Sequence, residues 1–472
     1  MAVTVFLLAL ADRYGPHRDE LYFVAAGHHL AWGYPDQPPL TPLIAAVADH
    51  IAHGDLVVLR LSSALVAGGL VIVSALTARE LGGARAAQVL TSVVVATGVV
   101  TMVIGHLLTT TSLDVLFWAV VLLLVLRALR RDDPRWWLWA GVVAGVGFEN
   151  KSLLAFLLVA VAVGVVLEPS ARHHLTSRWL WAGVLAALLL ALPNIIWEAA
   201  NGWPQLALSA DINAEYRVAS ERVFYVIQQL ILFSPLAGVL WVFGLVQLFR
   251  NPGLRWARPL ATAYVVLFVV FLVSGGKGYY LAGILPALAA AGCVVVAERW
   301  STRRLVVAGV ALALFAAVAW PAALPLLPPA TFADSAYSGI GEDQLETIGW
   351  PAFAATIHRV LDALPAAQRR SAVVFTENYG EAGALTFYGL PAPVYSGHNG
   401  WGYWGPPPQG AAPVIVVGYD RPSYDFTGCR RAGSIDNGLG VDNQEQGNVV
   451  WVCGSPRGGW QRAWPHLEHL DG

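Results

Sequence analysis

The chain has 472 residues, of which 56% are hydrophobic and only 13% are charged. Soluble domains carry about a quarter charged residues, so this composition excludes an ordinary soluble enzyme and indicates an integral membrane protein. The net charge of −2 and the lack of a basic tail give no reason to expect a nucleic-acid partner. Three cysteines are too few for a disulfide scaffold or a cysteine-rich metal site.

The chain begins with an apolar stretch, residues 1–11, which is too short to span a membrane alone. A polar loop follows, with the sequence HRDELYFVAAGHHLAWGYPDQPPL over residues 17–40. Residues 18–32 have the apolar spacing of a helix that lies in the membrane interface, and the prolines after it stiffen a turn. We expect Asp19 and Glu20 in the first turn of this helix, where the helix dipole favours carboxylates.

Apolar stretches of spanning or nearly spanning length follow the polar loop. They cover residues 56–78, 86–106, 113–129, 136–148, 153–167, 179–197, 223–249, 260–274, 279–297 and 305–321. With the N-terminal stretch they predict about eleven transmembrane helices. Arginines gather in alternate loops, which the positive-inside rule places in the cytoplasm. The polar loop and the C-terminal segment are then predicted on the extracytoplasmic side of the plasma membrane.

The C-terminal segment has a different composition. It contains the strand-like runs SAVVF and APVIVVGYD, a helical pattern near residues 353–364, and many Gly, Pro and Asn residues. We therefore predict a membrane domain over residues 1–324 and a small extracytoplasmic α/β domain over residues 325–472. Cys429 and Cys453 lie in the second domain, where an oxidising compartment leaves both a disulfide and two free thiols open.

The only two lysines of the chain, Lys151 and Lys277, fall in short turns on the predicted outer side, FENKSLL and GGKGYYLAG. Positive charge there opposes the positive-inside bias, and a compact ammonium group suits a phosphate at headgroup level. Lysines that anchor helix ends are the alternative explanation. Asp114, in TTTSLDVLFW, places a costly carboxylate in the first turn of a span, which helix capping by Ser112 does not explain. The histidines show no metal-ligand spacing, so we predict no metal site.

The sequence resembles bacterial polyprenyl-phosphate-dependent glycosyltransferases of the GT-C fold. This group includes the dolichyl-phosphate-mannose–protein mannosyltransferase superfamily and the lipid A aminoarabinose transferases. The resemblance begins with RDELYFVAAGHHLAWGYPDQPPL and continues in order through TSLDVLFWAVVLLLVLRAL, FENKSLLAFLL and KGYYLAGILPALAAAG. The C-terminal runs YGEAGALTFYG and SGHNGWGYWGPP resemble the outer domain of some bacterial members, but no chemistry follows from them.

The resemblance implies an inverting hexosyl- or pentosyltransferase that uses a polyprenyl-phosphate-linked sugar. Asp19 is predicted as the general base, with Glu20 beside it and Asp114 as a second catalytic carboxylate. Three further residues of the first loop, Asp36, Tyr22 and His29, are predicted to position the substrate.

The residues predicted to bind the donor phosphate are Lys151, Lys277, Tyr279, Tyr280, Arg217 and Arg222. The two arginines belong to a long outer loop, residues 198–222, which we expect to act as a lid or acceptor gate. No cofactor is required, and a divalent cation is left open. The acceptor is a glycan, a lipid or a protein hydroxyl, and the other partners are membrane lipids.

Two other functions fit a membrane protein with these charges. A transporter or flippase of polyprenyl-linked sugars would place charges through the middle of the spans and break helices there. A non-catalytic partner of a cell-wall assembly would keep its function without Asp19. Because the polar groups gather at one end of the predicted spans, the transferase is favoured.

Overall fold

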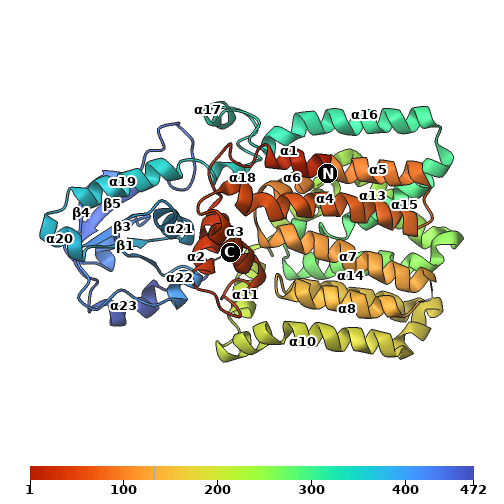
Figure 1. Ribbon diagram of the computed structural model, residues 1–472, viewed down its shortest axis with the longest axis horizontal. Coiled ribbons are helices and arrows are strands. Elements are labelled where there is room, and N and C mark those ends of the chain that lie inside the picture. Colours follow the sequence, from red (N-terminus) through yellow and green to blue (C-terminus); the bar gives the residue numbers. More distant parts are fainter. Residues whose placement is uncertain (132, 472) are drawn as a thin grey trace. The chain divides into compact units, whose positions relative to one another are not determined.

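The computed structural model describes residues 1–131 and 133–471 and divides into two compact units (Figure 1). The helical unit consists of Met1–Ala9, Gln37–Leu40 and Arg60–Trp320. The sheet unit consists of Leu10–Asp36, Thr41–Leu59 and Pro321–Gly472. The polar first loop therefore belongs, for the most part, to the same compact unit as the C-terminal segment.

The helical unit is built from helices of different lengths, most of them apolar. They are α1 (Ala2–Leu8), α4 (Leu56–Glu80), α5 (Arg85–Ala96), α6 (Val99–His106), α7 (Thr110–Arg131), α8 (Arg135–Phe148), α9 (Leu154–Leu167), α10 (Arg178–Ala200), α11 (Pro204–Glu215), α12 (Ala219–Ile231), α13 (Pro235–Arg250), α14 (Arg258–Ser274), α15 (Leu285–Arg299) and α16 (Thr302–Ala319). Short 3₁₀ helices connect them at η1 (Pro169–Thr176), η2 (Pro252–Ala257), η3 (Gly278–Leu281) and η4 (Trp320–Ala322).

Within the described residues, five helices are long and apolar enough to cross a membrane, and up to eight spans result if each bent helix pair counts as one. The chain is a multi-pass membrane protein. The predicted number of about eleven spans stays a prediction.

Two of the predicted spans, 86–106 and 223–249, are each broken into two helices. The α5–α6 pair bends by 62° and the α12–α13 pair by 90°. Backbone groups left unpaired at one break form hydrogen bonds with those at the other. The amide of Val99 donates to the carbonyl oxygen of Phe233 at 2.9 Å, and the amide of Val100 donates to that of Leu232 at 3.1 Å. Pro235, which lacks an amide hydrogen, starts α13 beyond the second break.

The sheet unit combines a mixed sheet with short helices. The strands are β1 (Val373–Thr376), β2 (Val394–Ser396), β3 (Val414–Val417), β4 (Arg430–Ser434) and β5 (Val449–Cys453). The helices are α2 (Arg18–Gly27), α3 (Leu40–Ile51), α17 (Pro329–Ala333), α18 (Glu342–Leu345), α19 (Trp350–Asp362), α20 (Ala366–Ser371), α21 (Tyr379–Phe387), α22 (Gly400–Tyr403), η5 (Pro422–Tyr424) and α23 (Trp460–Leu467).

The strand order is β2-β1-β3-β5-β4, with β1 parallel to β2 and β3, and β5 antiparallel to β3 and β4. Cys429 and Cys453 form a disulfide at the β4–β5 edge. One core cluster of this unit joins strand and helix residues to Leu21 of α2, which is 1% exposed. The first-loop helix is thus part of the hydrophobic core of the sheet unit.

Candidate functional site

The first loop forms the predicted helix, α2, and its N-terminus is closed by a capping box. The Nδ1 atom of His17 accepts a hydrogen bond from the Asp19 amide at 3.2 Å, and Glu20 Oε2 accepts one from the His17 amide at 2.8 Å. Glu20 is fully buried, whereas 32% of the Asp19 side chain is exposed. Glu20 therefore caps the N-terminus of α2, and Asp19 is the carboxylate of this pair that solvent reaches.

Asp19 is hydrogen-bonded to a residue far away in the sequence. The hydroxyl of Tyr379, the first residue of α21, donates to Asp19 Oδ1 at 2.8 Å. The guanidinium carbon of Arg18 lies 4.8 Å from the centre of the Tyr379 ring. Burial raises the pKa of Tyr379 well above its ordinary value, so its hydroxyl stays a donor. Sequence reasoning missed Tyr379; the available signal was the helix start NYGE, in which Asn378 and Glu381 form a capping box.

Asp36 holds a second tyrosine hydroxyl. Tyr22 Oη donates to Asp36 Oδ1 at 2.8 Å and accepts a hydrogen bond from the Gly400 amide at 3.1 Å. Burial raises the pKa of Asp36 to about 7, although the bond from Tyr22 opposes this shift. His29 is exposed and stacks on Trp404, with the ring centres 4.2 Å apart. The rings of Tyr22 and Tyr379 are 5.0 Å apart, so the structure brings the predicted first-loop residues together within the sheet unit.

Lys151 is the centre of a second group, in the helical unit. Its Nζ atom donates to Thr111 Oγ1 at 2.9 Å. The same atom lies 5.5 Å from the ring centre of Tyr279 and 5.6 Å from that of Tyr280, both in η3. These distances are typical of cation–π contacts. Three of the residues predicted to bind the donor phosphate, Lys151 and the two tyrosines, are thus brought together.

Asp114 belongs to the same group. It is 5% exposed in α7, and its Oδ1 atom has no hydrogen-bond partner among the described residues. Lys151 exerts an electrostatic attraction on this carboxylate. A buried carboxylate is costly unless a positive charge or a donor lies near it, so Lys151 compensates the charge of Asp114.

The other predicted phosphate ligands lie in the helical unit but not all join this group. Lys277 immediately precedes η3, and its Nζ atom lies 5.3 Å from the ring centre of Tyr216. Arg217 donates from Nε to the carbonyl oxygen of Ser274 at 3.1 Å, so it holds the turn that carries Lys277. Arg222 is exposed in the first turn of α12.

A cavity of about 230 Å³ lies between α10, the start of α11 and the turn that follows Phe148. Its walls are mostly apolar, but Glu198 is 4% exposed and contributes a buried carboxylate. Glu198 Oε2 accepts from the Gln205 amide at 3.3 Å, whereas Oε1 has no hydrogen-bond partner in the described chain. Trp203 lines the cavity from a left-handed backbone conformation with φ +62°, which is costly for a non-glycine residue.

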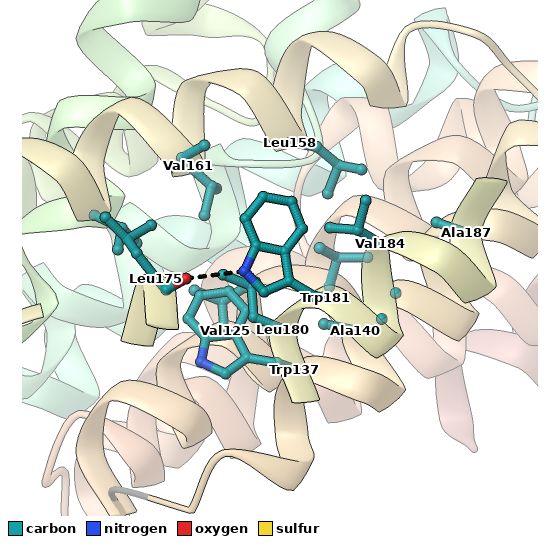
Figure 2. A pocket seen from close by; sticks show the side chains of 15 residues that line it. Val125, Trp137, Ala140, Leu158, Val161, Leu175, Leu180, Trp181, Val184 and Ala187 are labelled. Atoms are coloured by element: carbon teal, nitrogen blue, oxygen red, sulfur yellow. Dashed lines mark hydrogen bonds between the residues drawn. The ribbon is translucent and has the colours of Figure 1, made fainter. Parts of the chain in front are cut away.

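A second cavity, of about 220 Å³, is lined by residues of α7, α8, α9 and α10 (Figure 2). Apolar side chains surround it, and the one hydrogen bond drawn there joins Trp181 Nε1 to the carbonyl oxygen of Leu175 at 3.0 Å. A cavity without ionisable lining residues offers hydrocarbon contacts but no groups for acid–base chemistry. We therefore take the two polar groups described above, one in each unit, as two separate candidate sites.

Comparisons with known proteins bear on the fold of the chain. Residues 36–197 match the family model described as dolichyl-phosphate-mannose-protein mannosyltransferase. No curated protein matches the chain by sequence. A crystal structure of ArnT from Cupriavidus metallidurans bound to undecaprenyl phosphate superimposes with a TM-score of 0.62 at 17% identity, covering 96% of both chains. The apo structure of the same protein gives the same values. The GT-C fold predicted from the sequence is therefore confirmed, and the chain is a multi-pass membrane protein of that fold.

Proposed function

We propose that this protein is a membrane glycosyltransferase that moves a sugar from a polyprenyl-phosphate donor to a hydroxyl group of a glycan, lipid or protein on the extracytoplasmic side. The observation that carries the proposal is the group around Lys151, in which an ammonium, a threonine hydroxyl and two tyrosines meet beside a buried carboxylate. The ArnT structure of the same fold contains undecaprenyl phosphate, and the matching family model is named for a dolichyl-phosphate-mannose donor.

The donor phosphate would bind at Lys151. An ammonium ion attracts the phosphate, and the hydroxyls of Thr111, Tyr279 and Tyr280 supply hydrogen bonds to its oxygens. As the bond between the anomeric carbon and the phosphate oxygen breaks, negative charge grows on the leaving phosphate. Fixed donors that face this growing charge lower the barrier, because they stabilise the transition state more than the ground state.

Asp19 would act as the general base. Its carboxylate takes the proton of the acceptor hydroxyl while the oxygen attacks the anomeric carbon. The new carbon–oxygen bond forms on the face opposite the phosphate, so the configuration inverts, and the phosphate leaves with the electron pair of the broken bond. The proton on Asp19 then passes to solvent, which reaches this side chain because it is one-third exposed.

The cavity at Glu198 is our candidate for the acceptor. The unpartnered Oε1 atom of Glu198 accepts a hydrogen bond from an acceptor hydroxyl, and the apolar walls take a less polar part of the same molecule. Trp203 closes one side of the cavity. The segment that follows α10 would then serve as the acceptor gate predicted from the sequence.

The deciding experiment is an assay of purified protein with a polyprenyl-phosphate-linked sugar. The wild type should transfer sugar to an acceptor from the same membrane, and Asp19→Asn should lose most transfer while it keeps its thermal unfolding profile. Asp12→Asn, an exposed carboxylate of the same segment, is the control and should transfer normally. Normal transfer by Asp19→Asn would refute the base assignment. Movement of the donor across a vesicle membrane without transfer would favour the transporter instead.

A further inference from the structure

The C-terminal segment contains two runs, YGEAGALTFYG and SGHNGWGYWGPP, that the proposed reaction leaves without a role. Both runs lie against the helix that carries Asp19. Tyr379 of the first run donates to Asp19 Oδ1 at 2.8 Å, and Gly400 of the second donates its amide to the hydroxyl of Tyr22 at 3.1 Å. Asp19 and Tyr22 are three residues apart in α2 and so lie on one helix face.

We propose that the C-terminal α/β segment is a part of the catalytic apparatus that holds α2 in place, and that Tyr379 is the positioning residue that orients the carboxylate of Asp19. This inference rests on the proposed function, since it assigns Asp19 the role of base. Tyr379 itself touches no reacting atom.

The packing of α2 against α21 requires glycine. A Cβ atom added to Gly383 would lie 2.9 Å from the backbone carbon and the Cβ atom of Leu21. One added to Gly380 would lie 2.8 Å from the Cβ atom of Arg18, and one added to Gly400 would overlap the hydroxyl of Tyr22. Three glycines from the two unexplained runs thus permit α2 to approach closely enough for both tyrosine hydrogen bonds.

Tyr379 is itself fixed from several sides. Its ring packs against Arg18, Tyr22 and His398, with ring centres 5.0 Å from Tyr22 and 4.7 Å from His398. The capping box of Asn378 and Glu381 sets the position of the first turn of α21. The hydroxyl therefore reaches Asp19 from a side chain that has little freedom to move. A donor held in this way selects one orientation of a partly exposed carboxylate, which would otherwise rotate in solvent.

Tyr379→Phe tests the positioning role, because it removes the hydroxyl and keeps the ring. We expect kcat to fall about tenfold or more, as for a lost hydrogen bond to a charged group, with the donor KM unchanged. Tyr388→Phe, at the other end of α21, is the matched control and should keep the kcat and the donor KM of the wild type.

A second measurement does not depend on activity. Hydrogen–deuterium exchange of the full-length protein in detergent reports how firmly residues 18–27 are held. Gly383→Ala should speed exchange in this peptide, although alanine favours helices. Gly410→Ala, where an added Cβ meets nothing within 4 Å, should leave exchange unchanged.

The outcomes separate the two proposals. A wild type that transfers, an inactive Asp19→Asn and a Tyr379→Phe with normal kcat would overturn the positioning role alone. Equal activity of the wild type and Asp19→Asn would overturn the proposed base and, with it, the role of Tyr379. Unchanged exchange in Gly383→Ala would overturn the claim that the C-terminal segment holds α2.

Discussion

Asn150 donates a hydrogen bond from Nδ2 to the carbonyl oxygen of Thr110 at 2.8 Å. Asn150 is fully buried and immediately precedes Lys151, whereas Thr110 is the first residue of α7, the helix that carries Asp114. The side chain of Asn150 thus connects the turn that carries Lys151 to α7, the helix that carries Asp114. The geometry of the proposed phosphate site depends on this bond as well as on the charged groups themselves.

Asn150→Ala should therefore weaken the site without touching Lys151. The variant leaves a partly buried carbonyl group without its partner and releases the turn, so we expect kcat/KM for the donor to fall about tenfold. Transfer kinetics at saturating acceptor measure this effect. The control is Gln88→Ala, which removes a similar amide-to-carbonyl bond, to Gly83 at 3.0 Å, and should leave kcat/KM unchanged. Equal losses in both variants would show that the Asn150 bond has no special role.

Asp114→Asn should separate phosphate binding from transfer. The carboxylate of Asp114 offsets the charge of Lys151, so its removal leaves more positive charge for the phosphate. We expect polyprenyl phosphate to bind at least as tightly as to the wild type, while transfer slows because Lys151 is no longer held in one orientation. Binding is measured by calorimetry in detergent.

A double-mutant cycle with Lys151→Met isolates the coupling between the two residues. Once Lys151 is absent, Asp114→Asn should change phosphate affinity little. Phosphate binding that weakens in Asp114→Asn alone would contradict this assignment.

The sequence anticipates the elements whose signals are local. Helix α2 follows from the spacing of residues 18–32, and the resemblance places Asp114, Lys151 and the η3 tyrosines in one site because it links motifs in a fixed order. The structure brings Lys151, Asp114 and those tyrosines together, although their catalytic roles stay predictions. The hydrogen bond between Tyr379 and Asp19 was not predictable, because it joins residues 360 positions apart through the packing of two helices.

The helix breaks were missed for a related reason. An apolar stretch such as residues 223–249 is uniform in hydropathy, and nothing local shows that its free backbone groups find partners near Val99 and Val100. The sequence likewise identifies Glu198 only as the start of a loop. It does not predict the cavity that Glu198 lines, because residues from several helices form that cavity. Local pattern defines helices, whereas cavities and breaks depend on tertiary contacts.

Glu198→Gln should affect the acceptor more than the donor. The glutamine side chain keeps one carbonyl oxygen but has no negative charge. Its hydrogen bond from a hydroxyl of the sugar acceptor is therefore weaker. We expect the acceptor KM to rise severalfold and the donor KM to stay constant, as measured by varying each substrate in turn. Glu298→Gln, an exposed carboxylate near the end of α15, is the control. A change in the donor KM alone would show that the cavity binds the donor and not the acceptor.

Glu445→Gln should make the stability of the sheet unit less dependent on pH. Glu445 is 4% exposed, and neither carboxylate oxygen has a partner among the described residues. Burial, with help from Glu346 and Glu381 and against Arg18, raises the pKa of Glu445 to about 8 from the ordinary value of 4.5. The unfolded chain therefore releases the Glu445 proton at a lower pH than the folded chain does. The free energy of unfolding should fall as the pH rises from about 4.5 to about 8, and it should stay low above about pH 8.

Glutamine cannot ionise, so Glu445→Gln should unfold at a higher temperature than the wild type at pH 8.5 and at nearly the same temperature at pH 4.5. Tryptophan fluorescence during heating of the purified protein follows this transition, because Trp350, Trp460 and Trp464 are buried in the sheet unit. Glu468→Gln, which replaces an exposed carboxylate of the same unit, should show no such difference between the two pH values. A wild type whose unfolding temperature does not fall across this range would show that Glu445 reaches solvent or a partner in solution.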